Sequence, residues 1–457
     1  MTTAATNNNH NTLAAFISSL PFNPNADQLN ALDLLVQFLS PQHAGECFVL
    51  TGSAGTGKTS IIKAVTDYLH NQQTPFFLTA PTGRAARIIG KKTGNAARTL
   101  HSLVFEPELQ DDDVTVLLKP RQNTEQREAL YIVDESSMIS GMASAGGDFI
   151  CTTSLLQQFI TYVQQGNKSS RILFIGDVNQ LPPVGMAEPP ALNTLYLQQR
   201  YHLACMHYNL AQVMRQAEGS YLLDNATAIR DAIMQSAALP TIHVKVMPKI
   251  GNALNSFVRH LNVSDHQSAV MIAQSNKQVN ALNAMVRRNR FGWQEHPLLL
   301  PGESLVCNEN TMLDGQPVFN GDPLVLLNTW KPETFGGCHF INAEVEFVDC
   351  MGEVLRRKTK ILLESVAGDG FITIEKRKGI IAEAMKRNKK FREGRRPADD
   401  AFVSALKVRY GYALTCHKAQ GGEWRNVFIN PLFNKENLKW VYTAVTRASV
   451  DLYSWAA

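Results

Sequence analysis

Short apolar runs alternate with helix-like segments through the first half of the chain. The runs lie at residues 47–50, 76–79, 131–133 and 172–175, and they are rich in β-branched and aromatic residues. Strands that helices cover on both faces have continuous apolar sequences instead of alternating ones. The pattern therefore predicts an α/β fold in which these four segments form a parallel sheet.

A second block of the same kind follows in the second half. Strand-like runs occur at residues 269–273, 412–415 and 427–429, and the segment 276–290 has a helical pattern. Two alternating blocks predict two parallel sheets flanked by helices. The length of 457 residues also exceeds what a single hydrophobic core usually organises.

Two stretches interrupt the alternation. Residues 105–126 place Asp111-Asp112-Asp113 between strand-like segments, which predicts an inserted β-hairpin. Residues 331–404 contain strand-like runs at 345–348 and 360–363, which fits an inserted small β-barrel. Ten Lys and Arg residues then fall between positions 376 and 396. This basic run is either a solvated helix face or a surface that follows a polyphosphate.

Composition excludes some classes of protein. Lys and Arg number 44 against 40 Asp and Glu, so the net charge of +4 neither requires nor excludes a polyanionic partner. The seven cysteines are scattered, which argues against a disulfide framework and a zinc site. We find no bilayer-spanning apolar run and no basic signal-peptide segment, and expect a cytoplasmic protein with a disordered leader at residues 1–12.

The most specific motif lies directly after the first predicted strand. Residues 52–59 read Gly-Ser-Ala-Gly-Thr-Gly-Lys-Thr, which is a phosphate-binding loop. Its glycines let backbone N–H groups turn toward phosphate oxygens, Lys58 reaches the β- and γ-phosphates, and Thr59 offers its hydroxyl to Mg²⁺. The predicted nucleoside-triphosphate site consists of Gly52, Ala54, Gly55, Thr56, Gly57, Lys58, Thr59 and Ser60.

Polar residues follow two later strands of the same block. Asp134 and Glu135 come directly after the run 131–133, where α/β sheets hold their ligands. Asp134 is expected to bind Mg²⁺, and Glu135 to act as the general base for the attacking water. Gln180 follows the run 172–175, where its amide can contact the γ-phosphate or that water. Together with Lys58, these residues predict an ATPase centre.

Hydrolysis also needs a positively charged side chain that stabilises the negative charge developing on the phosphate. Arg215, between the two blocks, and Arg447, near the end of the second, are the two candidates. An arginine on a helix is most often a surface residue, so either one alone is weak evidence.

The motifs occur in the order that is typical of superfamily 1 helicases, and the chain resembles their 5′→3′ branch, which includes the RecD-like and Dda-like enzymes. The quoted segments are Thr79 to Arg87, Thr99 to Ser102, Asp134-Glu135, Gly176 to Pro182, Gln212 to Gln216, Tyr412 to Glu423 and Tyr442 to Arg447. The resemblance covers nearly the whole chain. It implies that Gln28 reads adenine, that ATP with Mg²⁺ is the cofactor, and that Gly422 and Glu423 contribute to the nucleotide site.

The same resemblance implies two RecA-like P-loop domains with two inserted subdomains. The first domain, 1A, is expected at residues 13–104 and 127–205, and the second, 2A, at residues 206–330 and 405–457. The hairpin 105–126 is then the strand-separating pin of subdomain 1B, and residues 331–404 form an SH3-like subdomain 2B. The acidic Asp111-Asp112-Asp113 is unusual beside a polyanion, and it suggests that the hairpin tip points away from the strand or packs on the basic insertion.

The nucleic-acid path is expected to contact the backbone of a single strand, because a motor must step through any sequence. The predicted contact residues are Pro81, Thr82, Arg84, His101, Thr415 and His417. Helix capping is an open alternative for the threonines, and a structural role in the core is open for the histidines.

The sequence thus predicts a 5′→3′ DNA helicase that hydrolyses ATP, binds single-stranded and duplex DNA and acts as a monomer. Single-strand-binding or other replication and recombination proteins are expected partners. A nucleic-acid-dependent loader or remodelling scaffold, or a motor that moves on RNA, remains an alternative, because no motif reads the 2′-hydroxyl.

Overall fold

The computed structural model describes residues 12–40, 45–109, 116–145, 149–213, 221–292, 298–349, 352–367, 372–394, 396–430 and 435–456. Within these ranges the chain forms two compact units, 12–108 with 116–213 and 221–456. The expected leader (apart from residue 12), the Asp111-Asp112-Asp113 tip, Arg215 and Arg395 lie outside the described residues. None of the described helices has both the length and the apolar content of a membrane span.

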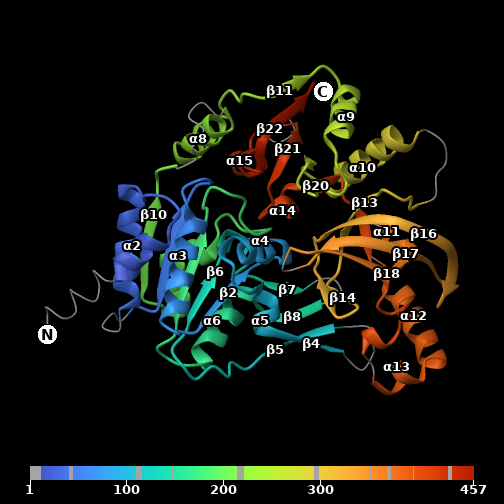
Figure 1. Cartoon of the computed structure of the whole chain (residues 1–457), viewed down its shortest axis with the longest axis horizontal. Helices are drawn as coiled ribbons and strands as arrows, with labels where there is room; N and C mark the ends of the chain where they lie inside the picture. The colour runs from blue at the N-terminus through green and yellow to red at the C-terminus, as the bar shows by residue number, and fades with distance from the viewer. Residues whose placement is uncertain are drawn as a thin grey trace, which may run out of the picture. The chain divides into compact units, whose positions relative to one another are not determined.

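The first unit is built on a six-stranded sheet in the order β10-β1-β9-β6-β2-β3, and all of its strands are parallel (Figure 1). The strands are β1 (Cys47–Gly52), β2 (Phe76–Ala80), β3 (Ala97–Thr99), β6 (Leu130–Val133), β9 (Arg171–Gly176) and β10 (Cys205–Leu210). The four predicted strands are confirmed as β1, β2, β6 and β9. Since β10 pairs with β1, this unit extends beyond the expected division at residue 205.

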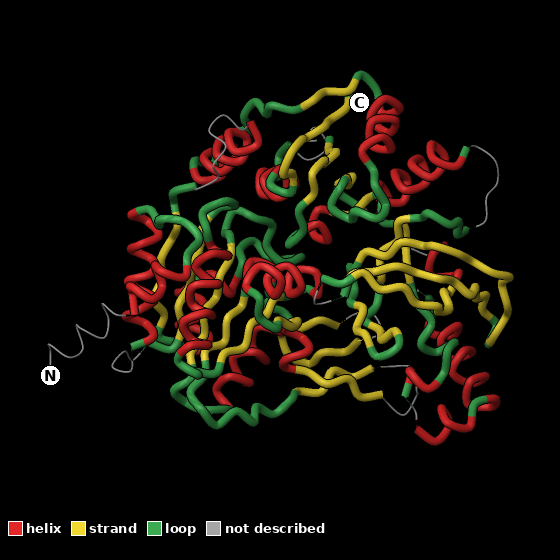
Figure 2. The backbone as a smooth tube through the Cα atoms, viewed as in Figure 1, coloured by secondary structure: helices red, strands yellow, loops and turns green. Residues whose placement is uncertain are grey.

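Helices cover both faces of this sheet (Figure 2). Helices α2 (Ala26–Leu39) and α3 (Lys58–Asn71) share one apolar core with Phe48 and Leu50 of β1. Helices α5 (Leu100–Val104), α6 (Leu155–Gln165) and α7 (Thr194–Tyr201) share the other core with Cys47 and Val49. Successive residues of a strand point to opposite faces, so β1 is buried along its whole length. Helix α4 (Gly83–Thr93) follows β2.

The first unit also contains a four-stranded sheet in the order β4-β5-β8-β7. Its strands are β4 (Phe105–Leu109), β5 (Val116–Pro120), β7 (Ala143–Ala145) and β8 (Phe149–Ser154). The strands β4 and β5 lie within the predicted hairpin, and β5 pairs in parallel with β8. The sheet therefore recruits strands from beyond residue 126, and the role of the hairpin as a pin stays a prediction.

The second unit contains a five-stranded parallel sheet in the order β11-β22-β21-β12-β20. Its strands are β11 (Lys245–Met247), β12 (Ala269–Ala273), β20 (Ala413–Thr415), β21 (Trp424–Ile429) and β22 (Ala448–Trp455). The three predicted strands are confirmed as β12, β20 and β21. Helices α9 (Ile250–His260) and α10 (Asn276–Phe291) pack on this sheet, while α8 (Tyr221–Met234) and α15 (Leu438–Val445) pack together and against β22.

An antiparallel sheet with the order β18-β17-β16-β13-β19 belongs to the same unit. Its strands are β13 (Ser304–Cys307), β16 (Pro323–Phe335), β17 (Cys338–Val348), β18 (Val354–Leu362) and β19 (Val408–Tyr410). The sheet thus extends to both sides of the expected insertion 331–404. The other elements here are the hairpin β14 (Thr311–Leu313) and β15 (Gln316–Val318), α11 (Leu363–Ala367), α12 (Ile374–Arg387) and α13 (Lys389–Gly394).

A buried ionic cluster joins the antiparallel sheet to the second parallel sheet. The Glu303 carboxylate is fully buried and accepts hydrogen bonds from Arg287 Nε at 2.7 Å and from the Tyr412 hydroxyl at 2.6 Å. Arg290 donates to the Tyr412 hydroxyl at 2.8 Å and to the Gly302 carbonyl at 3.1 Å. Removing one partner of such a buried pair typically costs about 3–5 kcal/mol. The cluster therefore fixes α10, the start of β13 and the residue before β20 in one arrangement.

Two glycines meet where the turn between β16 and β17 touches α12. A Cβ on Gly379 would lie 2.5 Å from the Gly336 carbonyl oxygen, and a Cβ on Gly336 would lie 2.5 Å from the backbone of Gly379 and Ile380. We expect Gly379→Ala to reduce the free energy of unfolding by about 1–3 kcal/mol, because the two backbones would have to separate. A lower midpoint of thermal unfolding and faster proteolysis within α12 would measure this.

Gly251 in α9 provides the matched control. A Cβ at Gly251 meets nothing within 4 Å, so Gly251→Ala is expected to raise stability by about 0.5–1 kcal/mol, since alanine is the better helix former. Equal midpoints for the two variants would contradict the packing role of Gly379.

Candidate nucleotide and nucleic-acid sites

The predicted nucleotide residues of the first unit lie at the carboxyl ends of its parallel strands. Gly52 ends β1, Asp134 follows β6, and Gln180 lies shortly after β9. Since β1, β9 and β6 are neighbours in the sheet, these ends share one edge, which is where α/β sheets bind ligands. The structure therefore brings together the phosphate-binding loop, the carboxylates and the glutamine that the sequence singled out.

The shape of the phosphate-binding loop depends on its glycines. Gly55 and Gly57 have φ values of +82° and +92°, a region that favours glycine. Gly52 is closely packed, because a Cβ there would lie 2.7 Å from Thr56 Oγ1. Lys58 Nζ donates to the carbonyls of Gly52 at 2.6 Å and Ser53 at 2.8 Å. These glycines and hydrogen bonds fix the shape of the loop, and the lysine that is expected to meet phosphate lies against it.

Helix α3 begins directly after this loop. Its N-cap residue is Gly57, which supplies no side-chain cap for the first turn. The first N–H groups of a helix have no acceptor within the helix, and the helix dipole makes this end positive. Lys58, Thr59 and Ser60 form that turn, so their N–H groups suit a phosphate oxygen.

Gln28, the expected adenine-reading residue, packs on the same loop. Its side chain is buried, and its amide donates to the Thr56 carbonyl at 3.1 Å. The amide occupies the space that a Cβ on Gly57 would need, since the two would lie 2.3 Å apart. Gln28 also forms a capping box with Asn25 at the start of α2.

Sequence reasoning missed the neighbouring Asp27. Its carboxylate accepts hydrogen bonds from the Tyr208 hydroxyl at 2.8 Å and from the backbone N–H groups of Ala211 and Gln212 at 2.8 and 2.9 Å. Asp27 therefore ties the start of α2 to the chain that leaves β10 toward Arg215. These partners are more than 180 residues away in sequence, so no local pattern could have indicated the contact.

The two carboxylates after β6 differ in their surroundings. The backbone N–H of Asp134 donates to the Thr79 carbonyl at 2.9 Å, which fixes the strand end. Desolvation and the adjacent Glu135 raise the pKa of Asp134 to about 7, although Lys58 opposes this shift. Glu135 has a φ of +51° in the left-handed region. Such a conformation costs a non-glycine residue about 1–3 kcal/mol, and it often marks functional sites.

The site has the oxygen donors that Mg²⁺ requires. Mg²⁺ binds through one or two carboxylates together with substrate phosphates and water. Asp134 supplies a carboxylate, Thr59 a hydroxyl in the first turn of α3, and Gln180 an amide oxygen. Within the described residues, the buried Oε1 atom of Gln180 has no hydrogen-bond partner. The residues present therefore fit a nucleotide with its divalent cation.

Arg447 is buried in the second unit. Its Nε donates to the Thr443 carbonyl at 3.0 Å, Nη1 to the Gly422 carbonyl at 3.1 Å and Nη2 to Thr446 Oγ1 at 3.1 Å. These bonds hold the guanidinium beside Gly422 and its neighbour Glu423, so the three residues that the sequence singled out here lie together. Arg215, the other candidate, lies outside the described residues.

The predicted nucleic-acid residues lie near helix starts after strands. Thr82 follows β2 and caps α4 by accepting a hydrogen bond from the Ala85 N–H at 3.2 Å. Thr415 ends β20 and caps α14 (Cys416–Ala419). Both threonines therefore have the capping role. His417 is half-buried in α14, and burial lowers its pKa.

The remaining predicted contacts, Pro81, Arg84 and His101, lie in the first unit. Pro81 directly follows β2, Arg84 lies in the first turn of α4, and His101 is exposed in α5. Contact of all six residues with nucleic acid stays a prediction.

Much of the basic run between residues 376 and 396 is paired with carboxylates. Lys386 and Arg387 pair with Glu383, Lys390 and Arg396 pair with Asp399, and Arg377 pairs with Glu309. By contrast, Lys376 and Lys378 are exposed, and neither pairs with a described carboxylate. Most described basic residues of the run are therefore paired at the surface, and fewer of them are available to bind a polyanion than the sequence suggested.

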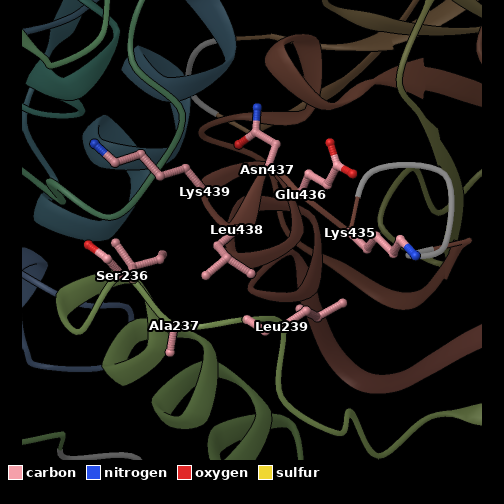
Figure 3. A pocket seen from close by; sticks show the side chains of 10 residues that line it. Ser236, Ala237, Leu239, Lys435, Glu436, Asn437, Leu438 and Lys439 are labelled. Carbon is pink, nitrogen blue, oxygen red and sulfur yellow. The ribbon is translucent and has the colours of Figure 1, made fainter.

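A groove of about 970 Å³ lies elsewhere in the second unit, between the end of α8 and the start of α15. Figure 3 shows Leu438 pointing toward the α8 side of the groove, while Lys435 and Lys439 point away from each other. None of the predicted site residues lines it.

Comparison with protein families gives two matches. An AAA domain model matches residues 25–243, and a UvrD-like helicase C-terminal domain model matches residues 410–453. The first region contains the phosphate-binding loop, Asp134-Glu135 and Gln180, and the second contains Thr415, His417 and Arg447.

Similar curated proteins cover most of the chain. The ATP-dependent RecD2 DNA helicase of Deinococcus radiodurans is 27% identical over 89% of this chain and 46% of its own length. The ATP-dependent DNA helicase dda of Enterobacteria phage T4 is 24% identical over 93% of this chain and 98% of its own. An uncharacterised protein of Methanocaldococcus jannaschii is 23% identical over 94% of this chain. The chain spans less than half the length of the first and third of these relatives.

Solved structures share the fold. The Pif1 helicase from Candida albicans superposes with a TM-score of 0.51 and 16% identity, and 95% of each chain is covered. The two parallel sheets thus have the RecA-like arrangement that the sequence predicted. The ordered motifs, the two matching family models and these relatives make the chain similar to the superfamily 1B group of Pif1-, RecD- and Dda-like helicases.

Proposed function

We propose that this protein is an ATP-dependent DNA helicase that moves 5′→3′ along single-stranded DNA and unwinds the duplex ahead. The observation that carries the proposal is the alignment of Lys58, Asp134-Glu135 and Gln180 along one edge of the first sheet. RecD2 and dda, two of its relatives, are named ATP-dependent DNA helicases.

Each residue of this edge has a proposed role in hydrolysis. The loop from Gly52 to Gly57 and the first turn of α3 hold the phosphates, while Gln28 reads adenine. Glu135 accepts the proton of the attacking water, and Gln180 orients that water or contacts the γ-phosphate. A divalent cation held by Asp134 and Thr59 would neutralise developing charge on the phosphates.

Movement requires the two RecA-like domains to hold the strand differently in different nucleotide states. We infer that ATP binding closes the domains and that product release reopens them, with Arg447 and Arg215 as candidates to stabilise the transferred phosphoryl charge. The nucleic-acid contacts would come from Pro81, Thr82, Arg84, His101, Thr415 and His417. Subdomain 2B would be the antiparallel sheet with α12 and α13, and subdomain 1B the sheet that contains β4 and β5.

The proposed partners are single-stranded and duplex DNA. The protein would act as a monomer in the cytoplasm, beside single-strand-binding or other replication and recombination proteins.

Displacement of a labelled oligonucleotide from tailed duplexes tests the proposal. We expect ATP-dependent displacement when the duplex has a 5′ tail and little when it has a 3′ tail, because the motor loads on the tail and moves toward the duplex. ATP hydrolysis is expected to rise when a DNA oligomer is added. A preference for 3′ tails would contradict the polarity, equal stimulation by a matched RNA oligomer would contradict the choice of DNA, and hydrolysis that ignores all oligomers would contradict the motor.

A further inference from the structure

Trp330 is the one Trp, Tyr or Phe side chain that is exposed among the residues described. It is 46% exposed, whereas Trp424, Trp440 and Trp455 are 3–5% exposed. An aromatic side chain gains much free energy from burial, and tryptophan is enriched at interfaces, where its ring can be covered by a ligand. Trp330 lies in β16 of the antiparallel sheet.

Trp330 lies at a β-bulge, where the pairing of β16 with β17 shifts register. Residues Thr329 and Pro332 pair with Ala343 and Ile341, so β16 has one more residue here than β17. A second register shift lies between Leu326 and Asn328. Bulges of this kind re-aim side chains and are often found at sites of function. The pairing of β16 is therefore irregular shortly before Trp330 and at Trp330 itself.

The Trp330 ring lies toward the far strand of the sheet. Lys358 Nζ in β18 is 5.6 Å from the centre of the ring, and β17 lies between β16 and β18. The indole and the Lys358 side chain therefore meet across β17 on one face of the sheet. A cation at this distance from an indole is attracted to its π-face.

Two lysines near Trp330, one in space and one in sequence, have no carboxylate partner among the described residues. Arg356 on this face pairs with Glu346 at 2.8 Å, and Lys360 pairs with Glu333. Lys331 and Lys358 are exposed, and neither forms an ion pair within the described part of the chain. Lys358 beside the ring and Lys331, the residue after Trp330 in β16, are thus two positive charges available to a ligand.

The same sheet face continues into the basic helices. Lys360, two residues beyond Lys358, lies 4.4 Å from the ring centre of Phe402, which belongs to the apolar core under α12 and α13. The exposed Lys376 and Lys378 are in α12. These lysines add unpaired positive charge on α12, a helix that contacts β17, and unpaired lysines suit a polyanion.

We propose that the Trp330 surface binds single-stranded nucleic acid, with a base stacked on the indole and with Lys331 and Lys358 contacting backbone phosphates. Stacking on an aromatic ring tolerates any base, as a motor requires. The proposal rests on the proposed function only for the identity of the track, because the aromatic ring and its two lysines form a separate binding surface.

Tryptophan fluorescence and affinity for a dT oligomer test this. The oligomer is expected to quench part of the wild-type emission, and this part should be absent in Trp330→Phe. We expect Trp330→Ala to weaken binding by about tenfold, since each stacked base contributes about 1–3 kcal/mol. Lys358→Ala should reduce the slope of log K against log salt by about 0.7, whereas Trp330→Ala leaves the slope unchanged.

Val354→Ala is the matched control, because Val354 is 62% exposed at the start of β18, the strand that carries Lys358. Its affinity and quenching should equal those of the wild type. Unchanged affinity of Trp330→Ala, or quenching that persists in Trp330→Phe, overturns the proposal. If quenching depends on Trp330 while ATP hydrolysis ignores oligomers, the binding surface stands and the helicase function falls. If Trp330→Ala binds the oligomer normally in an enzyme that unwinds DNA, the binding surface is contradicted and the helicase function is supported.

Discussion

Replacing Glu135 by glutamine is expected to leave ATP binding intact and to slow hydrolysis by about 10²–10⁴-fold, the usual contribution of a general base. Glutamine keeps the length and shape of the side chain, but its amide cannot accept the proton of the attacking water. The left-handed backbone conformation of residue 135 costs glutamate and glutamine the same free energy, because both side chains are unbranched at Cβ. Single-turnover hydrolysis and nucleotide-binding titration, measured side by side, separate chemistry from binding.

Glu128→Gln is the control for this variant. Glu128 lies before β6, at the opposite end of the strand that Glu135 follows, and its side chain is 50% exposed. Its loss should leave hydrolysis within about twofold of the wild type, because surface substitutions usually change little. Normal turnover by Glu135→Gln would remove Glu135 as the base.

Replacing Lys58 by alanine is expected to abolish most ATP turnover, by about 10²–10³-fold or more, because it removes the positive charge that meets the transferring phosphates. It also removes the hydrogen bonds to the Gly52 and Ser53 carbonyls. Binding of a DNA oligomer should stay largely intact, since the nucleic-acid contacts are proposed at other residues. Steady-state hydrolysis and oligomer affinity measure the two effects.

Lys63→Ala controls for the loss of a lysine from the same helix. Lys63 pairs with Asp67 one turn later in α3, a contact worth about 0.3–0.5 kcal/mol on a helix surface. This variant should hydrolyse ATP normally. A Lys58→Ala protein that still unwinds a tailed duplex would show that the nucleotide site is wrongly assigned.

The strands that the sequence predicted are those with the strongest local signal. β1, β6 and β9 are buried on both faces, so their sequences are continuous apolar runs. β10 contains His207 and Asn209, lies at the sheet edge and is half-exposed, so its pattern resembles a loop. β8 pairs with β5 from more than thirty residues away, and no local pattern carries that pairing.

The candidate site divides in the same way. The phosphate-binding loop and Asp134-Glu135 are contiguous in sequence, so motif and strand context sufficed to find them. The contacts of Gln28 with Thr56, of Asp27 with Ala211 and of Arg447 with Gly422 join distant segments. Those contacts depend on how the chain packs, and that packing is set by the whole core instead of by neighbouring residues.

The buried cluster around Glu303 has a mechanical consequence. Tyr412 directly precedes β20, the strand that ends at Thr415 and leads to His417. Its hydroxyl donates a hydrogen bond to Glu303, the residue before β13 of the antiparallel sheet. The antiparallel sheet is therefore connected to the end of β20 at Thr415 by buried hydrogen bonds as well as by the chain itself. A displacement of the antiparallel sheet is therefore expected to move the end of β20 with it.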